Sequence, residues 1–171
     1  MKKMVMMVLV AALMMPALAS AAQRSKPVLT PVDRQGDWHA GLGFGFRVHP
    51  VEFDSQFLAE YYVTNEVSVL MTMDIYAQAN LGTFNFMPMA RYHFDIPQVP
   101  GLLPFVGGGL GGYVTTAGTG GMEFAVPDWG LEYEIIPKLN VYTDMSCIHD
   151  TNFSAYNFSW RWVIAGVKYR F

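Results

Sequence analysis

The 171-residue chain has little of what many small domains depend on: it has one cysteine, four histidines and no excess of positive charge. The single cysteine, Cys147, excludes an intramolecular disulfide and therefore a disulfide-stapled secreted module. The histidines, at positions 39, 49, 93 and 149, lack metal-ligand spacing. The run GGGLGG is not followed by the Lys-Ser/Thr of a phosphate-binding loop. We therefore predict no cofactor and no metal.

Long apolar runs are also missing beyond residues 1–22, MKKMVMMVLVAALMMPALASAA. Two lysines precede the apolar core Met4–Met15, which is too short for a spanning helix of about 20 residues. This arrangement predicts a signal peptide over 1–22, cleaved between Ala19 and Gln23. Its removal leaves 9 basic against 14 acidic residues, so the net charge becomes −5 and gives no support for nucleic-acid binding.

The exported chain is nevertheless very apolar, because 52% of all residues are hydrophobic and 15% are aromatic. Without a helical span, these side chains need a large core or lipid around them. Residues 23–36 are polar with two prolines and predict a flexible leader. Residues 37–171 then have the length of one domain.

Apolar residues recur at every second position throughout this domain. The period of 2 is typical of β-strands and appears in eight segments, 38–49, 56–63, 67–76, 84–94, 103–114, 128–135, 139–147 and 162–171. A transmembrane strand needs about 9–11 residues, and eight is the smallest usual count for a closed barrel. We therefore predict an all-β fold, an eight-stranded antiparallel up-and-down transmembrane β-barrel. Pro88, in mid-strand, fits this scheme least well.

The second face of the strands carries charges that fit the inside of such a barrel. The predicted polar network of the interior, which His39 would join, consists of Arg47, Glu60, Asp74, Arg91, His93, Glu132, Glu134, Asp144, Lys168 and Arg170. A soluble barrel with an apolar core is the alternative. It gives no reason for aromatic residues at strand ends, whereas a bilayer does, through aromatic girdles at both interfaces.

Three stretches resemble the small eight-stranded outer-membrane β-barrels of Gram-negative bacteria, the family around the OmpA transmembrane domain, the opacity proteins and the OmpW-type barrels. They are WHAGLGFGF after the signal peptide, RYHFDIPQVPGLLPFVGGGLGGYV, and the final strand ending in Tyr169-Arg170-Phe171. The resemblance implies an outer-membrane location, contact with lipid and lipopolysaccharide, and both termini in the periplasm. It also implies that Tyr169 and Phe171 form the signal read by the outer-membrane assembly machinery. We expect a monomer.

The predicted outer loops are short, at about 49–56, 77–83, 115–122 and 148–157, which disfavours an adhesin. Because this fold hosts unrelated activities, the resemblance defines function only loosely. We predict a non-enzymatic protein with a structural or envelope-interaction role. A small channel for hydrophobic or small solutes is the first alternative.

The second alternative is a lipid A deacylase, because CIHDTNFS resembles the outer-rim motif of PagL-type enzymes. His149 and Thr151 share the lipid-facing parity and would act as base and nucleophile. Such chemistry also needs a carboxylate that orients the histidine. Asp150 has the wrong parity, and the outward places on the last strand are assigned to Ser159, Arg161 and Val163. The segment therefore favours a polar loop base without catalysis.

Overall fold

The computed structural model describes residues 33–48, 51–78, 81–151 and 156–171. The predicted signal peptide lies outside the described residues, as does most of the predicted leader. Among the described residues, no helix has the length and apolar character needed to cross a membrane.

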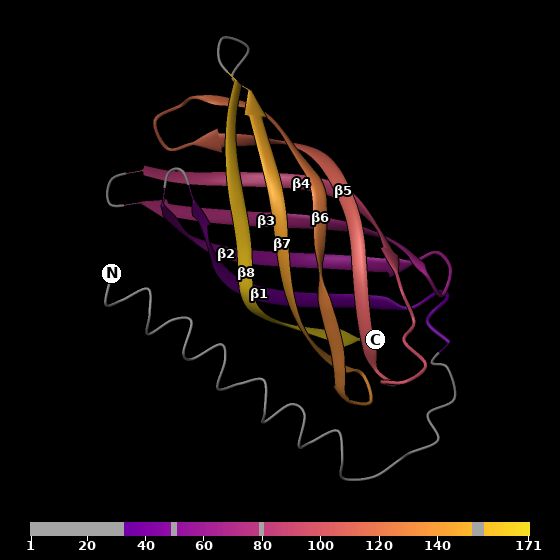
Figure 1. Cartoon of the computed structure of the whole chain (residues 1–171). Helices are drawn as coiled ribbons and strands as arrows, with labels where there is room; N and C mark the ends of the chain where they lie inside the picture. The colour runs from indigo at the N-terminus through magenta and orange to yellow at the C-terminus, as the bar shows by residue number, and fades with distance from the viewer. Residues whose placement is uncertain (1–32, 49–50, 79–80, 152–155) are drawn as a thin grey trace. The chain divides into compact units, whose positions relative to one another are not determined.

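The described chain forms one closed barrel of antiparallel strands (Figure 1). The strands are β1 Trp38–Val48, β2 Glu52–Tyr62, β3 Val67–Gln78, β4 Leu81–His93, β5 Leu102–Thr115, β6 Gly120–Ile136, β7 Leu139–Thr151 and β8 Tyr156–Arg170. Each strand pairs with the next in the chain, and β1 also pairs with β8, which closes the barrel. The predicted eight-stranded up-and-down barrel is confirmed.

The barrel has two ends that differ in their connections. The terminal end holds the start of β1, the end of β8 and the turns after β2, β4 and β6. The loop end holds the connections after β1, β3, β5 and β7. The predicted outer loops were drawn too long, because residues 52–56, 120–122 and 148–151 belong to strands.

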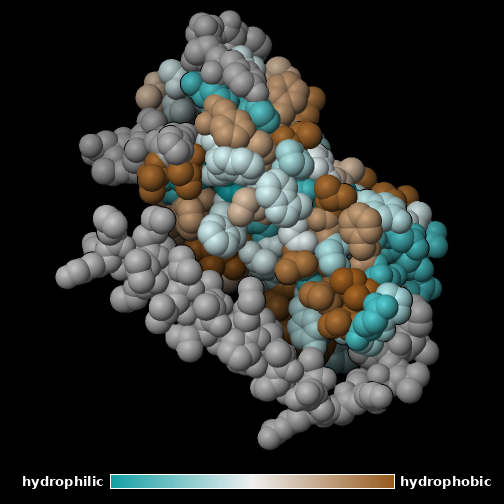
Figure 2. Space-filling view, viewed as in Figure 1, coloured by the Kyte–Doolittle hydropathy of each residue, from teal (hydrophilic) through white to brown (hydrophobic). Residues whose placement is uncertain are grey.

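The wall of the barrel carries the apolar residues and the interior carries the charged ones. Phe44, Phe57, Phe86 and Leu110 are each 43–56% exposed on the outer face. Figure 2 shows brown, hydrophobic residues on the visible face of the described part of the chain. The strongly polar residues that alternate with them are buried. A soluble barrel would reverse this distribution, so the wall suits lipid rather than water.

An aromatic band surrounds the terminal end. Trp38, Tyr92, Tyr169 and Phe171 are all exposed there, and the Trp38 ring lies 5.0 Å from that of Tyr61. Rings of this kind, with an apolar body, are typical of the level where lipid headgroups meet the acyl region. These four aromatic residues at strand ends therefore form a girdle at the terminal end of the barrel.

The last strand departs from strict alternation at one bulge. Phe44 of β1 pairs with Ala165 and Gly45 with Val163, so Ile164 is an extra residue. Ile164 and Ala165 consequently both face outward.

Because of this bulge, the side chains of β8 that precede it face the opposite way from the prediction. Trp162 and Ile164 are 39% and 48% exposed on the wall, whereas Val163 is fully buried inside. The prediction was right for 165–171 and wrong for 162–164, because alternation was counted from the C-terminus through the extra residue. Thr143 covers the bulge by donating its hydroxyl hydrogen to the carbonyl of Val163 at 2.7 Å.

Pro88 sits in β4 without breaking the sheet. It faces outward and pairs in register with Met71 of β3. On the other side, the ladder with β5 pairs Phe86 and then Met89, and leaves the proline out. The missing N–H of the proline therefore falls where that ladder is interrupted.

Met73 lies in the middle of the outer face of β3. We expect Met73→Arg to lower the free energy of unfolding of the barrel in a bilayer by about 2–4 kcal/mol. The cause is the transfer of a charge into the apolar region. Urea titrations of the barrel folded into phospholipid vesicles measure this. Val63→Arg, at the terminal end, is the control and should cost about 0–1 kcal/mol. Equal effects at both positions would contradict a lipid-facing wall.

Candidate functional site in the barrel interior

Two arginines and three aspartates form a central layer across the interior. Arg161 of β8 donates from Nη1 to both carboxylate oxygens of Asp74 of β3, at 3.1 and 3.0 Å. Arg91 of β4 donates from Nε to Asp128 at 2.8 Å and from Nη2 to Asp144 at 3.0 Å. All five side chains are fully buried. The layer therefore links strands on opposite sides of the barrel.

A second layer lies nearer the terminal end, around Lys168 of β8. Its ammonium donates to Glu60 of β2 at 2.5 Å and to Glu132 of β6. Ser68 donates to Glu60 at 2.5 Å and lies 2.9 Å from Nε2 of His93. All these groups are buried, so this terminal-end layer closes the interior below the central one.

A third layer, near the loop end, surrounds Arg47 of β1. Its guanidinium donates to Glu123 at 2.9 Å, to Asp150 at 2.5 Å and to the hydroxyl of Ser159 at 2.7 Å. It also lies 5.1 Å from the centre of the Tyr76 ring. With Glu52 and Asp54, which are buried on β2, this loop-end layer is rich in acid.

Glycines in the wall make room for the larger interior side chains. A Cβ at Gly166 would come 2.2 Å from the ring of Tyr142, and a Cβ at Gly43 would come 2.6 Å from its hydroxyl. The tyrosine therefore crosses the interior over these glycines, and its hydroxyl donates to Gln56 at 2.8 Å.

Apolar residues fill the space between the charged layers. The interior has two such clusters, one of Leu70, Met87, Met89, Ala125 and Ile148, and one of Leu58, Tyr142 and Val163. Their side chains are all at most 5% exposed. The interior is thus a packed core and provides little room for an open pore.

Most of the predicted network residues lie in these layers. The structure brings eight of them into the buried interior: Arg47, Glu60, Asp74, Arg91, His93, Glu132, Asp144 and Lys168. His39 is buried as well, with its ring 5.0 Å from that of Tyr62.

Two predicted members lie outside the network. Glu134 accepts a hydrogen bond from the backbone N–H of Lys138 in the β6–β7 turn, and Arg170 contacts Asp37 at 3.4 Å. Both are partly exposed at the terminal end, because Arg170 is the last residue of β8 and Glu134 lies two residues before the end of β6. Their inward parity is therefore not enough to bury them.

The sequence missed several interior residues. Arg161 was assigned to the wall because of the β8 bulge. Glu52 and Asp54 fell in the predicted loop 49–56, and Glu123 fell between the predicted loop 115–122 and the next predicted strand. Asp128 stands directly after the β6 bulge at Ala125–Asp128. Strand lengths drawn up to the turn residues would have found Glu52 and Asp54. They would have placed Glu123 on the wall, because the β6 bulge changes the parity and no pattern in one sequence marks the bulges.

His149 and Thr151 lie on the outer wall near the loop end, with the predicted parity. The His149 ring lies 5.3 Å from that of Phe158, and its Nε2 lies 3.3 Å from the carbonyl of Val126. Asp150 points inward to Arg47. The His149 ring therefore lies beside an aromatic ring of β8 on the wall.

The prediction of which β8 residues face outward beside His149 was also wrong. Ser159, Arg161 and Val163 were expected there, but all three are buried inside. Phe158, Trp160 and Trp162 occupy the wall instead. No described wall position of β8 next to His149 thus offers the carboxylate that a hydrolase of this type requires.

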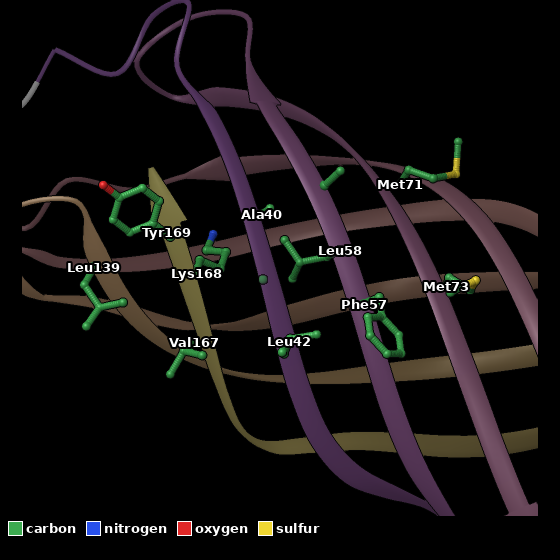
Figure 3. A pocket seen from close by; sticks show the side chains of 12 residues that line it. Ala40, Leu42, Phe57, Leu58, Met71, Met73, Leu139, Val167, Lys168 and Tyr169 are labelled. Atoms are coloured by element: carbon green, nitrogen blue, oxygen red, sulfur yellow. The ribbon is translucent and has the colours of Figure 1, made fainter. Parts of the chain in front are cut away.

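The outer wall is hollowed near the terminal end by a shallow groove with a volume of about 560 Å³ (Figure 3). Ala40 and Ala59 lie between the larger Phe57, Met71 and Tyr169, which stand around it. The small side chains on neighbouring strands create the hollow. Its lining is nearly all apolar, which suits contact with acyl chains.

Metal ligation has no preformed site in the described ranges. No group of three or more His, Cys, Asp or Glu side chains in this part of the chain has an arrangement that could by itself hold a metal ion.

The segment before β1 is fixed to the terminal end. Although residues 23–36 were predicted as flexible, the described residues 33–36 contact the β2–β3 turn. The side-chain oxygen of Asn65 accepts backbone N–H bonds from Arg34 and Gln35, at 2.7 and 3.1 Å. The Arg34 guanidinium also contacts Asp95, after β4, at 3.3 Å.

Comparisons with known proteins agree with this architecture. No protein-family model and no curated protein matches the chain. Among solved structures, Neisserial surface protein A matches with a TM-score of 0.65 and 15% identity over 80% of this chain and 98% of the other. The N-terminal β-barrel domain of Pseudomonas aeruginosa OprF matches with a TM-score of 0.62 and 16% identity over 80% and 98%.

The outer membrane protein OprG of Pseudomonas aeruginosa matches with a TM-score of 0.59 and 9% identity over 84% of this chain and 99% of the other. The chain therefore has the fold of the small eight-stranded outer-membrane barrels, as the sequence resemblance predicted. At these identities the likeness defines the architecture, and function has to be argued from the residues of this chain.

We expect Arg161→Met to destabilise the barrel by about 3–5 kcal/mol, because three buried aspartates lose the cation between them. Urea unfolding in detergent micelles, followed by tryptophan fluorescence, measures the change. Arg170→Met is the matched control, and the loss of its partly exposed pair with Asp37 should cost about 0–1 kcal/mol. A neutral Arg161→Met would show that the central layer is not held by charge.

Proposed function

We propose that this protein is a non-enzymatic β-barrel of a Gram-negative outer membrane, with a structural or envelope-interaction role. The observation that carries the proposal is the distribution of its side chains. The wall is apolar, and the interior is charged, paired and packed. Such a molecule is stable in lipid and has little space inside for a reaction or a passage.

The apolar wall also supports a proposal about which molecules contact the barrel in the membrane. The apolar belt and the aromatic band would contact lipid, and the headgroups of lipopolysaccharide would lie at the loop end. Tyr169 and Phe171 are exposed, with their rings 5.3 Å apart, which supports their role as the signal for the assembly machinery. Because the barrel closes on itself, the strands leave no edge for a partner, and we propose a monomer.

A channel is supported less well. The three charged layers bridge the interior, and the Leu58–Tyr142–Val163 cluster fills it between them. An ion or solute that passed through would have to break the Arg161–Asp74 and Arg91–Asp144 pairs. The hydrolase is also supported less well, because Asp150 is bound to Arg47 on the far side of the wall from His149.

We expect the full chain to fractionate with the outer membrane, to give no steady single-channel steps in planar bilayers and to leave lipid A unchanged when it is overproduced. Mass spectrometry of lipid A beside a His149→Ala control decides the last point. Loss of an acyl chain with the wild type alone would replace the proposal by an enzyme. Regular conductance steps would replace it by a channel.

We expect deletion of Phe171 to lower the amount of folded barrel in cells several-fold, because the assembly machinery would lose the last aromatic residue of its signal. The folded fraction is measured by its heat-modifiable migration on gels. Spontaneous folding of the same variant into vesicles should change little, because Phe171 is 71% exposed and packs little. An equal loss in both assays would show a role in stability instead.

A further inference from the structure

The shallow groove on the outer wall follows a row of residues that pair in register across four strands. Tyr169 of β8 pairs with Ala40 of β1, which in turn pairs with Ala59 of β2. Ala59 then pairs with Met71 of β3. A second row of larger residues, also in register, runs beside the first and consists of Val167, Leu42, Phe57 and Met73. The two alanines therefore leave an open space beside the larger second row.

The groove is inclined, with one end at the terminal rim of the barrel and the other in the apolar part of the wall. Tyr169 is next to last in β8, whereas Ala40 is the third residue of β1 and Met71 the fifth of β3. Each strand thus meets the row further from the terminal end, as expected for tilted strands. Figure 3 shows Leu139 and Tyr169 at one end of the lining and Met71 and Met73 at the other. An extended apolar chain in the groove would enter the bilayer from the rim.

One exposed positive charge stands at the rim, where the groove begins. Of the described lysines and arginines, four are engaged inside the barrel in the charged layers. Arg34 and Arg170 lie at the terminal end and contact Asp95 and Asp37. Lys138, in the β6–β7 turn, is exposed, and no described carboxylate forms an ion pair with it. Among the described cations it is therefore the one available to an anion from outside.

Lys138 is fixed to the strands that line the groove. Its carbonyl accepts the backbone N–H of Arg170 at 2.9 Å. The next residue, Leu139, lines the groove and pairs with Tyr169. Lys138 has a φ of 76°, in the left-handed region that favours glycine, so the turn itself does not favour a lysine. A lysine stem can lie along apolar surface while its ammonium reaches the headgroup level.

We propose that the groove holds one acyl chain of an anionic glycerophospholipid, with the lipid phosphate beside Lys138. The inference rests on the proposed function, because it needs the barrel in an outer membrane with both termini in the periplasm. The lipid then belongs to the leaflet that faces the periplasm. The nearly all apolar lining fits an acyl chain, and an ammonium is a common partner of phosphate. The aromatic band around the rim marks the headgroup level at this end.

Native mass spectrometry tests the proposal. The full chain is refolded in detergent with phosphatidylglycerol or with phosphatidylcholine of the same acyl chains. We expect one phosphatidylglycerol retained per chain, with a preference of about fivefold over phosphatidylcholine, from one lysine near the headgroup. Lys138→Gln should remove this preference, and Lys138→Arg should keep it. Ala40→Leu should lower the retention of both lipids several-fold, because the larger side chain fills the groove. Ala77→Leu, at an exposed wall position near the loop end, is the matched control and should change neither.

Heat-modifiable migration on gels shows whether each variant has folded, and Ala59→Leu replaces Ala40→Leu if the latter does not fold. A wild-type chain that does not enter membranes would contradict the proposed function. A folded wild type that retains no lipid would overturn this inference alone. Equal retention of the two lipids, or an unchanged preference in Lys138→Gln, would also overturn it. Unchanged retention by the groove-filling variant would place the lipid elsewhere on the wall, and a dimer without lipid would show that a second chain covers the groove.

Discussion

The interior of this barrel depends on ion pairs that cross it. The sheet ladder connects each strand only to its two neighbours, whereas Arg161 joins β8 to β3 and Arg91 joins β4 to β7. Lys168 joins β8 to β2 and β6 in the same way. These pairs add little net stability compared with an apolar core, but the loss of one partner is costly. They therefore restrict what can occupy the neighbouring positions.

Space is the second constraint, and glycine provides it. Long side chains cannot cross a barrel of eight strands unless some wall positions carry no side chain. Tyr142 lies over Gly43 and Gly166, and the Arg91 side chain lies beside Gly107, where a Cβ would come 2.9 Å from its Cγ. Charged layers and wall glycines are thus two parts of one packing arrangement.

The fold was largely predictable from the sequence, because alternation over eight segments leaves few other architectures. The interior was predictable where alternation holds to the end of a strand, as for Glu60, Asp74 and Lys168. It was not predictable at Arg161, because one extra residue at Ile164 reverses the facing of the whole N-terminal part of β8. Glu52 and Asp54 were missed for another reason, because β2 begins inside the segment that was predicted as a polar loop. The prediction that Glu134 and Arg170 belong to the interior network was wrong because both lie near strand ends. Side chains there are exposed even where their parity points inward.

The β8 bulge has a consequence for how related chains could differ in length. At most positions of a strand, the loss of one residue would exchange the lipid face and the interior face for everything beyond it. At Ile164, the same loss would remove the bulge and leave the facing unchanged, because outward Ala165 would then be followed directly by inward Val163. Trp160 and Trp162 would stay on the wall, and Arg161 would stay in the interior. Ile164 is therefore a residue that the strand could lose without exchanging its two faces. Changes of length in this barrel are tolerable in the connections, and in the wall at a bulge of this kind.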